Sequence, residues 1–493
     1  MTRAASCALV VIALAACGGD DGEDQIQAES TYAALCATPR AGTDPATNLP
    51  YGDAQGTVLD EQHWVQSWIN HLYLWYSEVP DPDVKSFATA IDYFAALKTP
   101  ALTASGKAKD QFHFTYDTTY WDSLSGSGVE AGYGVQWVLV KRSPPRQLLV
   151  AYTQPGTPGD DAMITRGAEV LTIDGVDLVN GSDVGTLNDG ISPSAAGQSH
   201  TFVIRDVADG PTRSVTLVSE DIELAPVQSI PLAAPNDTVG YLLFTDHIAT
   251  AEKGLVDEVT KLQATGITDL VLDLRYNGGG YLDIAAELAY MIAGPTATAG
   301  KVFDREQFND KYPTINPVTG QALTPSLFVS QTEGFSVAPG QALPHLDLPR
   351  VFVLTSPGTC SASEAVMNGL AGVGVDVIQI GETTCGKPYG FYPQDNCGTT
   401  FFAIQFQGVN DKGFGDYADG FVPNGVFHGC VVADDLTHPL GDPAEARLAA
   451  ALAYRTSGTC TTARLDAMAN PLAAVSGGVP VKPVWRQNRI VLR

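Results

Sequence analysis

Three short segments of this sequence hold the residue types that acyl transfer needs. They are a glycine-rich segment at 273–280, a serine segment at 359–364 and a lysine segment at 381–387. Serine is a weak nucleophile until a base removes its proton, and a neutral lysine can be that base. Backbone N–H groups exposed beside glycines can bind a developing oxyanion. Ser361 and Lys387 are therefore the first residues to place in the fold.

Two other interpretations compete for the same residues. Ser361 and Glu364 fit the S-x-x-E capping box of a helix N-terminus, so the serine taken alone favours a structural role. The glycine-rich segment would also suit a phosphate group at a helix N-terminus. The phosphate interpretation is disfavoured, because the segment contains neither GxxxxGK[ST] nor GxGxxG.

The elements around these segments favour catalysis over capping. Strand-like apolar runs lie at 239–244, 269–274, 350–355 and 375–380, and helical spacing lies between runs at 253–264 and 361–370. The last three runs precede the three segments. The alternation predicts an α/β core with a mainly parallel sheet. Because the carboxyl ends of parallel strands meet at one edge, the three loops are expected to lie together.

The complete chain is predicted to be a multidomain α/β protein. Residues 223–462 form the α/β core, residues 126–222 an inserted β domain, residues 56–122 a small N-terminal helical unit and residues 463–493 a C-terminal extension. The helical unit is predicted from apolar residues at helical spacing, interrupted by Pro80 and Pro82: Trp64, Trp68, Leu72, Trp75, Phe87, Ile91, Phe94 and Leu97.

The N-terminus indicates export. A positive start is followed by a short apolar run and then Leu14-Ala-Ala-Cys17, and the run is too short to span a bilayer. Leu-Ala-Ala-Cys resembles the bacterial lipobox, which implies a signal peptide at 1–16, lipid on Cys17 and an acidic tether within 17–55. A plain signal peptide that happens to contain Cys17 is the alternative. The expected location is the cell envelope, with the chain lipid-anchored to a bacterial membrane.

The remaining composition narrows partners and cofactors. The net charge of −27 argues against nucleic acid as a partner. Six cysteines outside the export segment permit disulfides, and short loops favour Cys385 with Cys397 and Cys430 with Cys460. No CxxC or paired Cys/His spacing supports zinc, so neither a metal nor a cofactor is expected.

Together, the three segments resemble the C-terminal processing peptidases, also called tail-specific proteases. The matching motifs are Asp-Leu-Arg-X-Asn-Gly-Gly-Gly, Ser-Ala-Ser-Glu and Gly-Glu-X-Thr-X-Gly-Lys, in that order. The resemblance implies that Ser361 is the nucleophile and Lys387 the base. It also implies an oxyanion hole from Gly278 or Gly279 together with the N–H of Ala362.

The chain departs from that pattern around the two central residues. Lys387 is followed by Pro388, and the acidic residue expected along the helix after the serine is not in register. The third catalytic partner therefore stays open, and His247 is a minor candidate because related enzymes use His and Glu with the serine. A lysine amine normally titrates near 10.4, so Lys387 must be buried to act as a base.

Residues 126–222 resemble a PDZ domain. Gly132, Tyr133, Gly134 and Val135 stand where that family has its carboxylate-binding loop. Backbone N–H groups freed by glycine can hold an anion, and an open strand edge can accept an extended peptide. The resemblance therefore implies peptide capture by this domain.

The predicted function is an exported serine endopeptidase that trims or degrades cell-envelope polypeptides. Their C-termini are among the expected cleavage sites. Two alternatives remain. One is a non-catalytic peptide-binding lipoprotein that uses the PDZ-like domain. The other is an esterase, which is disfavoured because G-x-S-x-G is absent.

Overall fold

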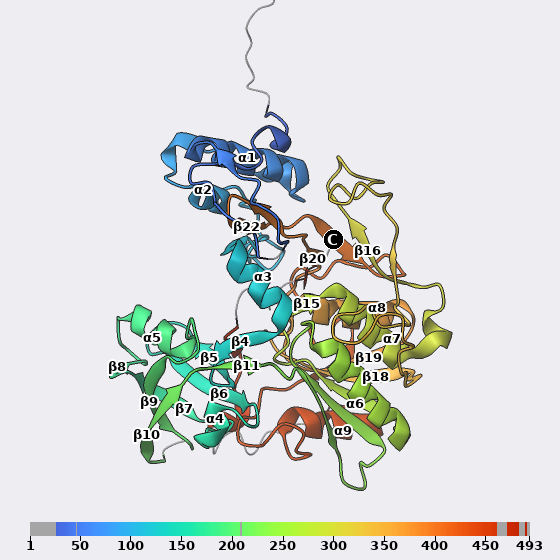
Figure 1. Ribbon diagram of the computed structural model, residues 1–493. Coiled ribbons are helices and arrows are strands. Elements are labelled where there is room, and N and C mark those ends of the chain that lie inside the picture. The colour runs from blue at the N-terminus through green and yellow to red at the C-terminus, as the bar shows by residue number, and fades with distance from the viewer. Residues whose placement is uncertain (1–25, 46, 208–209, 461–470, 483–488, 491–493) are drawn as a thin grey trace, which may run out of the picture.

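The protein is described from a computed structural model (Figure 1). The described residues are 26–45, 47–207, 210–460, 471–482 and 489–490. The predicted signal peptide and Cys17 lie outside them. No helix among the described residues has the length and apolar character that crossing a membrane requires.

A six-stranded sheet forms the centre of the core. Its order is β12 (Val227–Pro231), β13 (Val239–Phe244), β14 (Asp269–Asp273), β18 (Arg350–Thr355), β19 (Asp376–Gly381) and β24 (His428–Val431). β12 pairs antiparallel with β13, and the pairings from β13 to β24 are parallel. β13 and β14 are buried along their full length, as expected for parallel strands covered on both faces.

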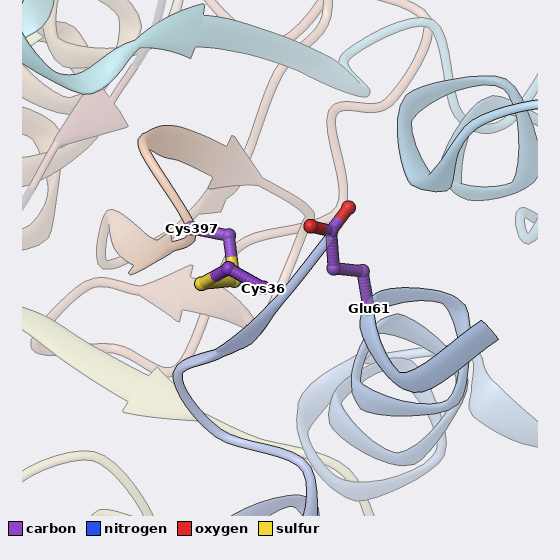
Figure 2. A group of neighbouring side chains, drawn as sticks. All are labelled: Cys36, Glu61 and Cys397. Carbon is purple, nitrogen blue, oxygen red and sulfur yellow. A yellow bond between two sulfur atoms is a disulfide. The ribbon is translucent and has the colours of Figure 1, made fainter. Parts of the chain in front are cut away.

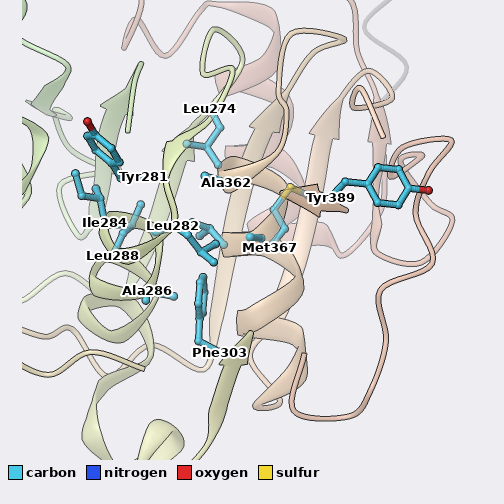
Figure 3. Packing of buried hydrophobic residues seen from close by; sticks show 14 of the residues in the cluster. Leu274, Tyr281, Leu282, Ile284, Ala286, Leu288, Phe303, Ala362, Met367 and Tyr389 are labelled. Carbon is cyan, nitrogen blue, oxygen red and sulfur yellow. The ribbon is translucent and has the colours of Figure 1, made fainter. Parts of the chain in front are cut away.

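Helices cover both faces of this sheet. Side chains of α6 (Ala251–Thr265), α7 (Leu282–Thr298) and α8 (Ala362–Gly372) share one buried cluster with alternate sheet residues such as Leu272. α9 (Ala446–Ser457) packs on the other alternate set. Figure 3 shows Leu282 of α7 on the side of that helix that faces Met367 of α8. This packing fixes where α8 begins, and therefore where Ser361 lies.

The β-rich segment, residues 126–222, has a hydrophobic core of its own. Its sheet order is β10 (Thr212–Val218), β9 (Ser199–Arg205), β7 (Glu169–Ile173), β6 (Gln147–Thr153), β5 (Val135–Lys141) and β25 (Val479–Pro480), with β8 (Val176–Asp177) beside β7. Two helices, α4 (Pro158–Asp161) and α5 (Val184–Ile191), accompany the sheet. The strands that lead in and out, β4 (Val129–Gly132) and β11 (Glu220–Glu223), pair antiparallel. The chain therefore enters and leaves this segment at one place.

The N-terminal unit differs from its prediction at three positions. α1 (Val58–Leu72) and α2 (Ala90–Ala96) form, but Trp75, Phe87 and Leu97 lie outside them. α1 ends because Tyr73 is extended and the N–H of Leu74 donates to the carbonyl of Ile404, 2.8 Å away. A tertiary contact thus overrides a helical pattern that continues in the sequence.

Short strands join the N-terminal unit to the core. β3 (Phe114–Asp117) pairs with β22 (Thr399–Phe402), which also pairs with β21 (Gln394–Asn396). β16 (Val302–Gln307) pairs with β17 (Ser326–Leu327) and β23 (Phe406–Val409), and β23 pairs with β20 (Tyr389–Gly390). The remaining elements are α3 (Thr118–Ser127), β1 (Leu35–Cys36), β2 (Ala54–Gln55), β15 (Gly280–Tyr281) and β26 (Arg489–Ile490). Within the described residues, four single 3₁₀ turns complete the set: Glu29–Thr31, Tyr76–Glu78, Val84–Ser86 and Pro471–Ala474.

One disulfide prediction is confirmed and the other is wrong. Cys430 bonds Cys460, as expected. Cys397 bonds Cys36, 361 residues earlier, and Cys385 bonds Cys360. Figure 2 shows the Cys36–Cys397 bridge beside Glu61. Short sequence separation is a weak guide here, because the fold brings the N-terminal segment onto the turn between β21 and β22.

Candidate active site

The carboxyl ends of β14, β18 and β19 lead directly into the three segments singled out in the sequence. β14 ends at Asp273, β18 at Thr355 and β19 at Gly381. Several hydrogen bonds join the loops: the N–H of Cys360 donates to the carbonyl of Asn277 at 3.2 Å, and the N–H of Cys385 donates to that of Thr359 at 3.0 Å. The structure therefore brings these loops together.

Ser361 occupies an unusual backbone position at the start of α8. Its φ of 60° and ψ of −111° lie in a region that non-glycine residues rarely adopt. The residue is fully buried, and its Oγ has no hydrogen-bond partner among the described residues. Ser361 and Glu364 do stand in the predicted capping-box arrangement, with the Glu364 carboxylate accepting the N–H of Ser361, but the Ser361 Oγ makes no cap hydrogen bond. A serine that served only as a helix cap would use this oxygen to accept a backbone N–H. Strain of this kind gathers at functional sites, so the geometry favours a chemical role for Ser361.

Glu364 links the serine loop to the lysine loop. Its buried carboxylate accepts the backbone N–H of Ser361 at 2.9 Å, of Gly386 at 2.9 Å and of Lys387 at 2.8 Å, and the hydroxyl of Thr384 at 2.5 Å. Burial raises the pKa of Glu364, and these hydrogen bonds oppose that rise. One side chain therefore fixes the backbone on both sides of the candidate dyad.

A disulfide makes a second link between the same loops. Cys360 directly precedes Ser361, and its partner Cys385 lies two residues before Lys387. The two Cα atoms are 5.2 Å apart. The serine and lysine loops are thus joined by a covalent bond as well as by the Glu364 carboxylate.

Lys387 is fully buried, as predicted. Its Nζ lies 4.7 Å from the ring centre of Phe112 and 4.5 Å from that of Phe391. Burial favours the neutral amine, whereas aromatic faces attract the ammonium. Phe112 comes from the N-terminal unit, which therefore contributes a wall to the lysine pocket.

Asn277 organises the glycine-rich loop. Its amide nitrogen donates to the carbonyl of Phe244 at 3.1 Å, and its Oδ1 accepts the N–H of Gly279 at 3.0 Å. A Cβ at Gly280, where φ is 130°, would lie 2.2 Å from the carbonyl oxygen of His247. Only glycine fits that close approach, so the last glycine of the motif serves packing.

His247, the second candidate base from the sequence, also lies at this end of the sheet. It is fully buried, and its Nδ1 lies 3.0 Å from Asn277 Oδ1. Because that oxygen is an acceptor, Nδ1 carries the proton and Nε2 keeps its lone pair. Nε2 is buried and has no partner among the described residues. Burial lowers the pKa of His247 to about 4, so the imidazole is neutral at pH 7.

A buried ionic cluster anchors the loop from behind. Arg275 binds Asp273 at 2.9 Å, Asp434 at 2.7 Å and Glu445 at 2.7 Å. Arg166 of the β-rich segment also binds Asp434, at 2.7 Å. These guanidinium groups hold the pKa of Asp434 well below its usual range. The cluster fixes the position of the glycine-rich loop relative to the rest of the core.

The loop Gly132–Val135 lies at a separate cavity of about 870 Å³. The cavity is lined from the β-rich segment by this loop and β5, and from the core by Leu243, Thr245 and Asp246. Neither Ser361 nor Lys387 lines it. The structure therefore keeps the predicted peptide-binding loop apart from the candidate dyad.

Comparison with known proteins addresses the family. Residues 238–392 match Peptidase family S41, and residues 60–116 match the Peptidase S41 N-terminal domain. The first match contains all three loops of the candidate site. These matches support peptidase family S41.

Relatives of known name agree with the S41 matches. A carboxyl-terminal-processing protease of a Picosynechococcus species is 27% identical over 271 residues, which are 54% of this chain and 56% of that protein. One from a Synechocystis species is 25% identical over 343 residues, 68% of this chain and 70% of that protein. The chain thus spans about half to two thirds of these relatives. They support a serine-type peptidase.

A solved structure shares the fold. The crystal structure described as an S41 protease from Bacteroides fragilis has a TM-score of 0.58 and 22% identity, covering 80% of this chain and 97% of that one. This likeness shows the S41 fold in the present chain.

Two features of the candidate site escaped prediction from the sequence. Glu364 was interpreted only as half of a capping box, although it also bonds Gly386 and Lys387. The Cys360–Cys385 bridge was missed because short sequence separation favours Cys385 with Cys397 and leaves Cys360 unassigned. One pattern in the sequence could have indicated both features. Cys360 and Glu364 lie on either side of Ser361, and Cys385 lies two residues before Lys387.

Proposed function

We propose that the protein is a serine endopeptidase in which Ser361 is the nucleophile and Lys387 the general base. The observation that carries the proposal is the buried, strained and unpartnered Ser361 Oγ, in a loop that Glu364 joins to Lys387. A structural serine would have no reason to keep its hydroxyl buried without a partner.

The proposed reaction begins when the neutral Lys387 amine takes the proton of Ser361 Oγ. The oxygen attacks the peptide carbonyl, and the amine portion leaves with the proton that the lysine returns. Water then hydrolyses the acyl-enzyme by the same route. Because the N–H of Gly279 already donates to Asn277, the N–H of Gly278 is the better oxyanion donor of the two, together with that of Ala362.

The proposed substrates are polypeptides of the cell envelope, cleaved near their C-termini or within the chain. The relatives support this class, because their names describe C-terminal processing. Three disulfides agree with an exported protein, since such bonds persist in oxidising compartments. A lipid anchor on Cys17 and a PDZ-like role for residues 126–222 belong to the same proposal.

His247 is the second candidate for the general base. The specific observation in its favour is the buried Nε2 lone pair, which has no partner among the described residues. Against it stands the lowered pKa of about 4, which makes the imidazole a weak base.

Mass spectrometry of an unfolded protein substrate tests the function. The wild type is expected to release peptides that are absent with Ser361→Ala, and identical C-terminal pieces would indicate tail-specific processing. Unchanged products with Ser361→Ala would overturn the proposal. Peptide binding without cleavage by the wild type would favour the non-catalytic binding protein.

A further inference from the structure

The segment 471–482 is docked on the rest of the molecule. Leu472 and Val475 pack in a buried cluster with Leu149 of β6 and Leu436 of the core. Val475 also exchanges two backbone hydrogen bonds with Asp434, at 2.8 and 2.7 Å. The chain therefore approaches β5 from a fixed starting point.

Beyond that point the segment becomes the last strand of the β-rich sheet. β25 pairs antiparallel with β5, with Val479 opposite Leu139 and Pro480 opposite Val138. β25 is the edge of that sheet in the described part of the chain. The direction of β25 takes the segment toward the amino end of β5, where the Gly132–Val135 loop lies. This is how an extended peptide adds to an open sheet edge.

Val481 continues the pairing and fills apolar space. Its N–H donates to the carbonyl of Trp137 at 2.9 Å, and its carbonyl accepts the side-chain amide of Gln136 at 3.0 Å. Its side chain packs against the core of the β-rich segment, as does Ile191 of α5. Val481 also lines the 870 Å³ cavity.

Lys482 secures the end of this strand with a buried charge. Its Nζ donates to the carboxylate of Asp246 at 2.8 Å and to the carbonyl of Thr245 at 2.6 Å. Both charged side chains are almost inaccessible to solvent. Asp246 directly precedes His247, so the segment is fastened beside the candidate site.

The same segment touches the loops that carry the chemistry. A Cβ added to Gly358, three residues before Ser361, would lie 2.4 Å from Cδ of Pro480. The N–H of Gly477 donates to Glu382 at 2.9 Å. Residues 471–482 therefore lie along the predicted peptide-accepting edge and against the loops that lead to Ser361 and Lys387.

We propose that residues 471–482 are an intramolecular occupant of the β5 edge, and that an extended segment of another polypeptide must displace them to bind there. The inference rests on the proposed function in one respect: the displaced state is the one that presents polypeptide to Ser361. When a ligand binds only a minor conformational state, its apparent affinity is the intrinsic affinity multiplied by the fraction of molecules in that state. Residues 471–482 thereby restrain the enzyme until an extended segment of another polypeptide displaces them.

Binding is measured without catalysis, so that failure of the peptidase proposal leaves this test intact. All variants carry Ser361→Ala. The probe is a fluorescein-labelled peptide with the sequence of residues 474–482, and fluorescence anisotropy reports its Kd. Val481→Pro removes the N–H that bonds Trp137, and Lys482→Glu replaces the ion pair with repulsion from Asp246.

The double variant is expected to bind the probe at least about tenfold more tightly than the parent, because the edge is already vacant. Lys261→Glu is the matched control for charge, since Lys261 lies exposed on α6; its Kd should equal that of the parent. Equal affinity of parent and double variant, or no binding by either, would overturn the proposal.

A cross-link tests the opposite direction and does not depend on the stability of the double variant. Leu139→Cys with Val479→Cys joins two residues that face each other in the sheet. The oxidised variant should fail to bind the probe, and mild reduction should restore the parent Kd. The parent exposed to the same reductant controls for the native disulfides. Full binding by the oxidised variant would show that the probe does not use this edge.

Discussion

The two candidate bases lie in pockets that the protein builds in different ways. The Lys387 pocket is walled by two aromatic rings, and its backbone is joined to Ser361 by Glu364 and by the Cys360–Cys385 bond. The His247 pocket is joined instead to the glycine-rich loop through Asn277. The difference suggests a division of roles. The lysine pocket is coupled to the proposed nucleophile, whereas the histidine pocket is coupled to the proposed oxyanion donors.

Replacing each candidate base should give the largest difference in kcat between the two pockets. Lys387→Met should lower kcat by about 10³-fold or more, since it removes the general base while keeping an unbranched apolar side chain. His247→Asn should lower kcat by less than about tenfold, through its effect on the glycine-rich loop. Steady-state cleavage of a peptide substrate provides both numbers. A reversed order of the two losses would assign the base to His247.

The pH dependence of kcat/KM distinguishes the two pockets without mutation. If His247 is the base, its pKa of about 4 means that activity should reach a plateau above roughly pH 5. If an amine is the base, activity should keep rising beyond pH 7 as the amine loses its proton. We expect the second profile. A flat profile from pH 5 to pH 9 would contradict the Ser361–Lys387 assignment.

The Cys430–Cys460 disulfide is a matched control for the Cys360–Cys385 bond that joins the serine and lysine loops. The Cys360–Cys385 and Cys430–Cys460 bonds span 25 and 30 residues, so chain entropy gives each about 3.5 kcal/mol of stability. Replacing both cysteines of a pair by alanine should therefore cost similar stability in urea titrations. Only loss of the first pair should also lower kcat, because it loosens the loops of Ser361 and Lys387. Equal kcat for the two double variants would reduce that bond to a purely structural role.

Glu364→Gln should produce a smaller effect. The amide retains one acceptor oxygen but presents an NH₂ group where the second oxygen meets backbone N–H donors. We expect a loss of about 1–3 kcal/mol of stability and about a tenfold fall in kcat with little change in KM. Glu364→Asp, which keeps both oxygens on a shorter side chain, should restore part of kcat if positioning is the cause.

Replacing Glu287 should have the smallest effect, a change in how Tm depends on pH. This change reports on the helices beside the His247 pocket. It lies on α7, and burial raises its pKa to about 9. A carboxyl group with a folded-state pKa above its unfolded value stabilises the fold fully below the unfolded pKa of about 4.5. That contribution is lost as pH rises through about 9. The Tm of the wild type should therefore fall from pH 7 to pH 9.5 more than that of Glu287→Gln, and equal falls would contradict the shift.

Much of the core could be predicted because its patterns are local. The runs 239–244 and 350–355 are strands with the predicted ends, and Lys387 is buried as its chemistry required. The two helices are separate, as Pro80 and Pro82 predict. The helical spacing fails at Trp75, because the N–H of Leu74 donates to the distant carbonyl of Ile404, and at Phe87, which caps the 3₁₀ turn Val84–Ser86. The cysteine pairing failed because it depends on which distant segments meet.

The sequence by itself determined which residue types stand at the carboxyl ends of the strands, because apolar periodicity and glycine placement are written locally. It could not reveal that Ser361 Oγ lacks a partner, that Glu364 holds two loops, or that Val479 and Val481 pair with β5. Those facts arise only when segments separated by tens to hundreds of residues pack together. Hydrogen bonds and buried charges are then satisfied, or left open, by the tertiary structure alone.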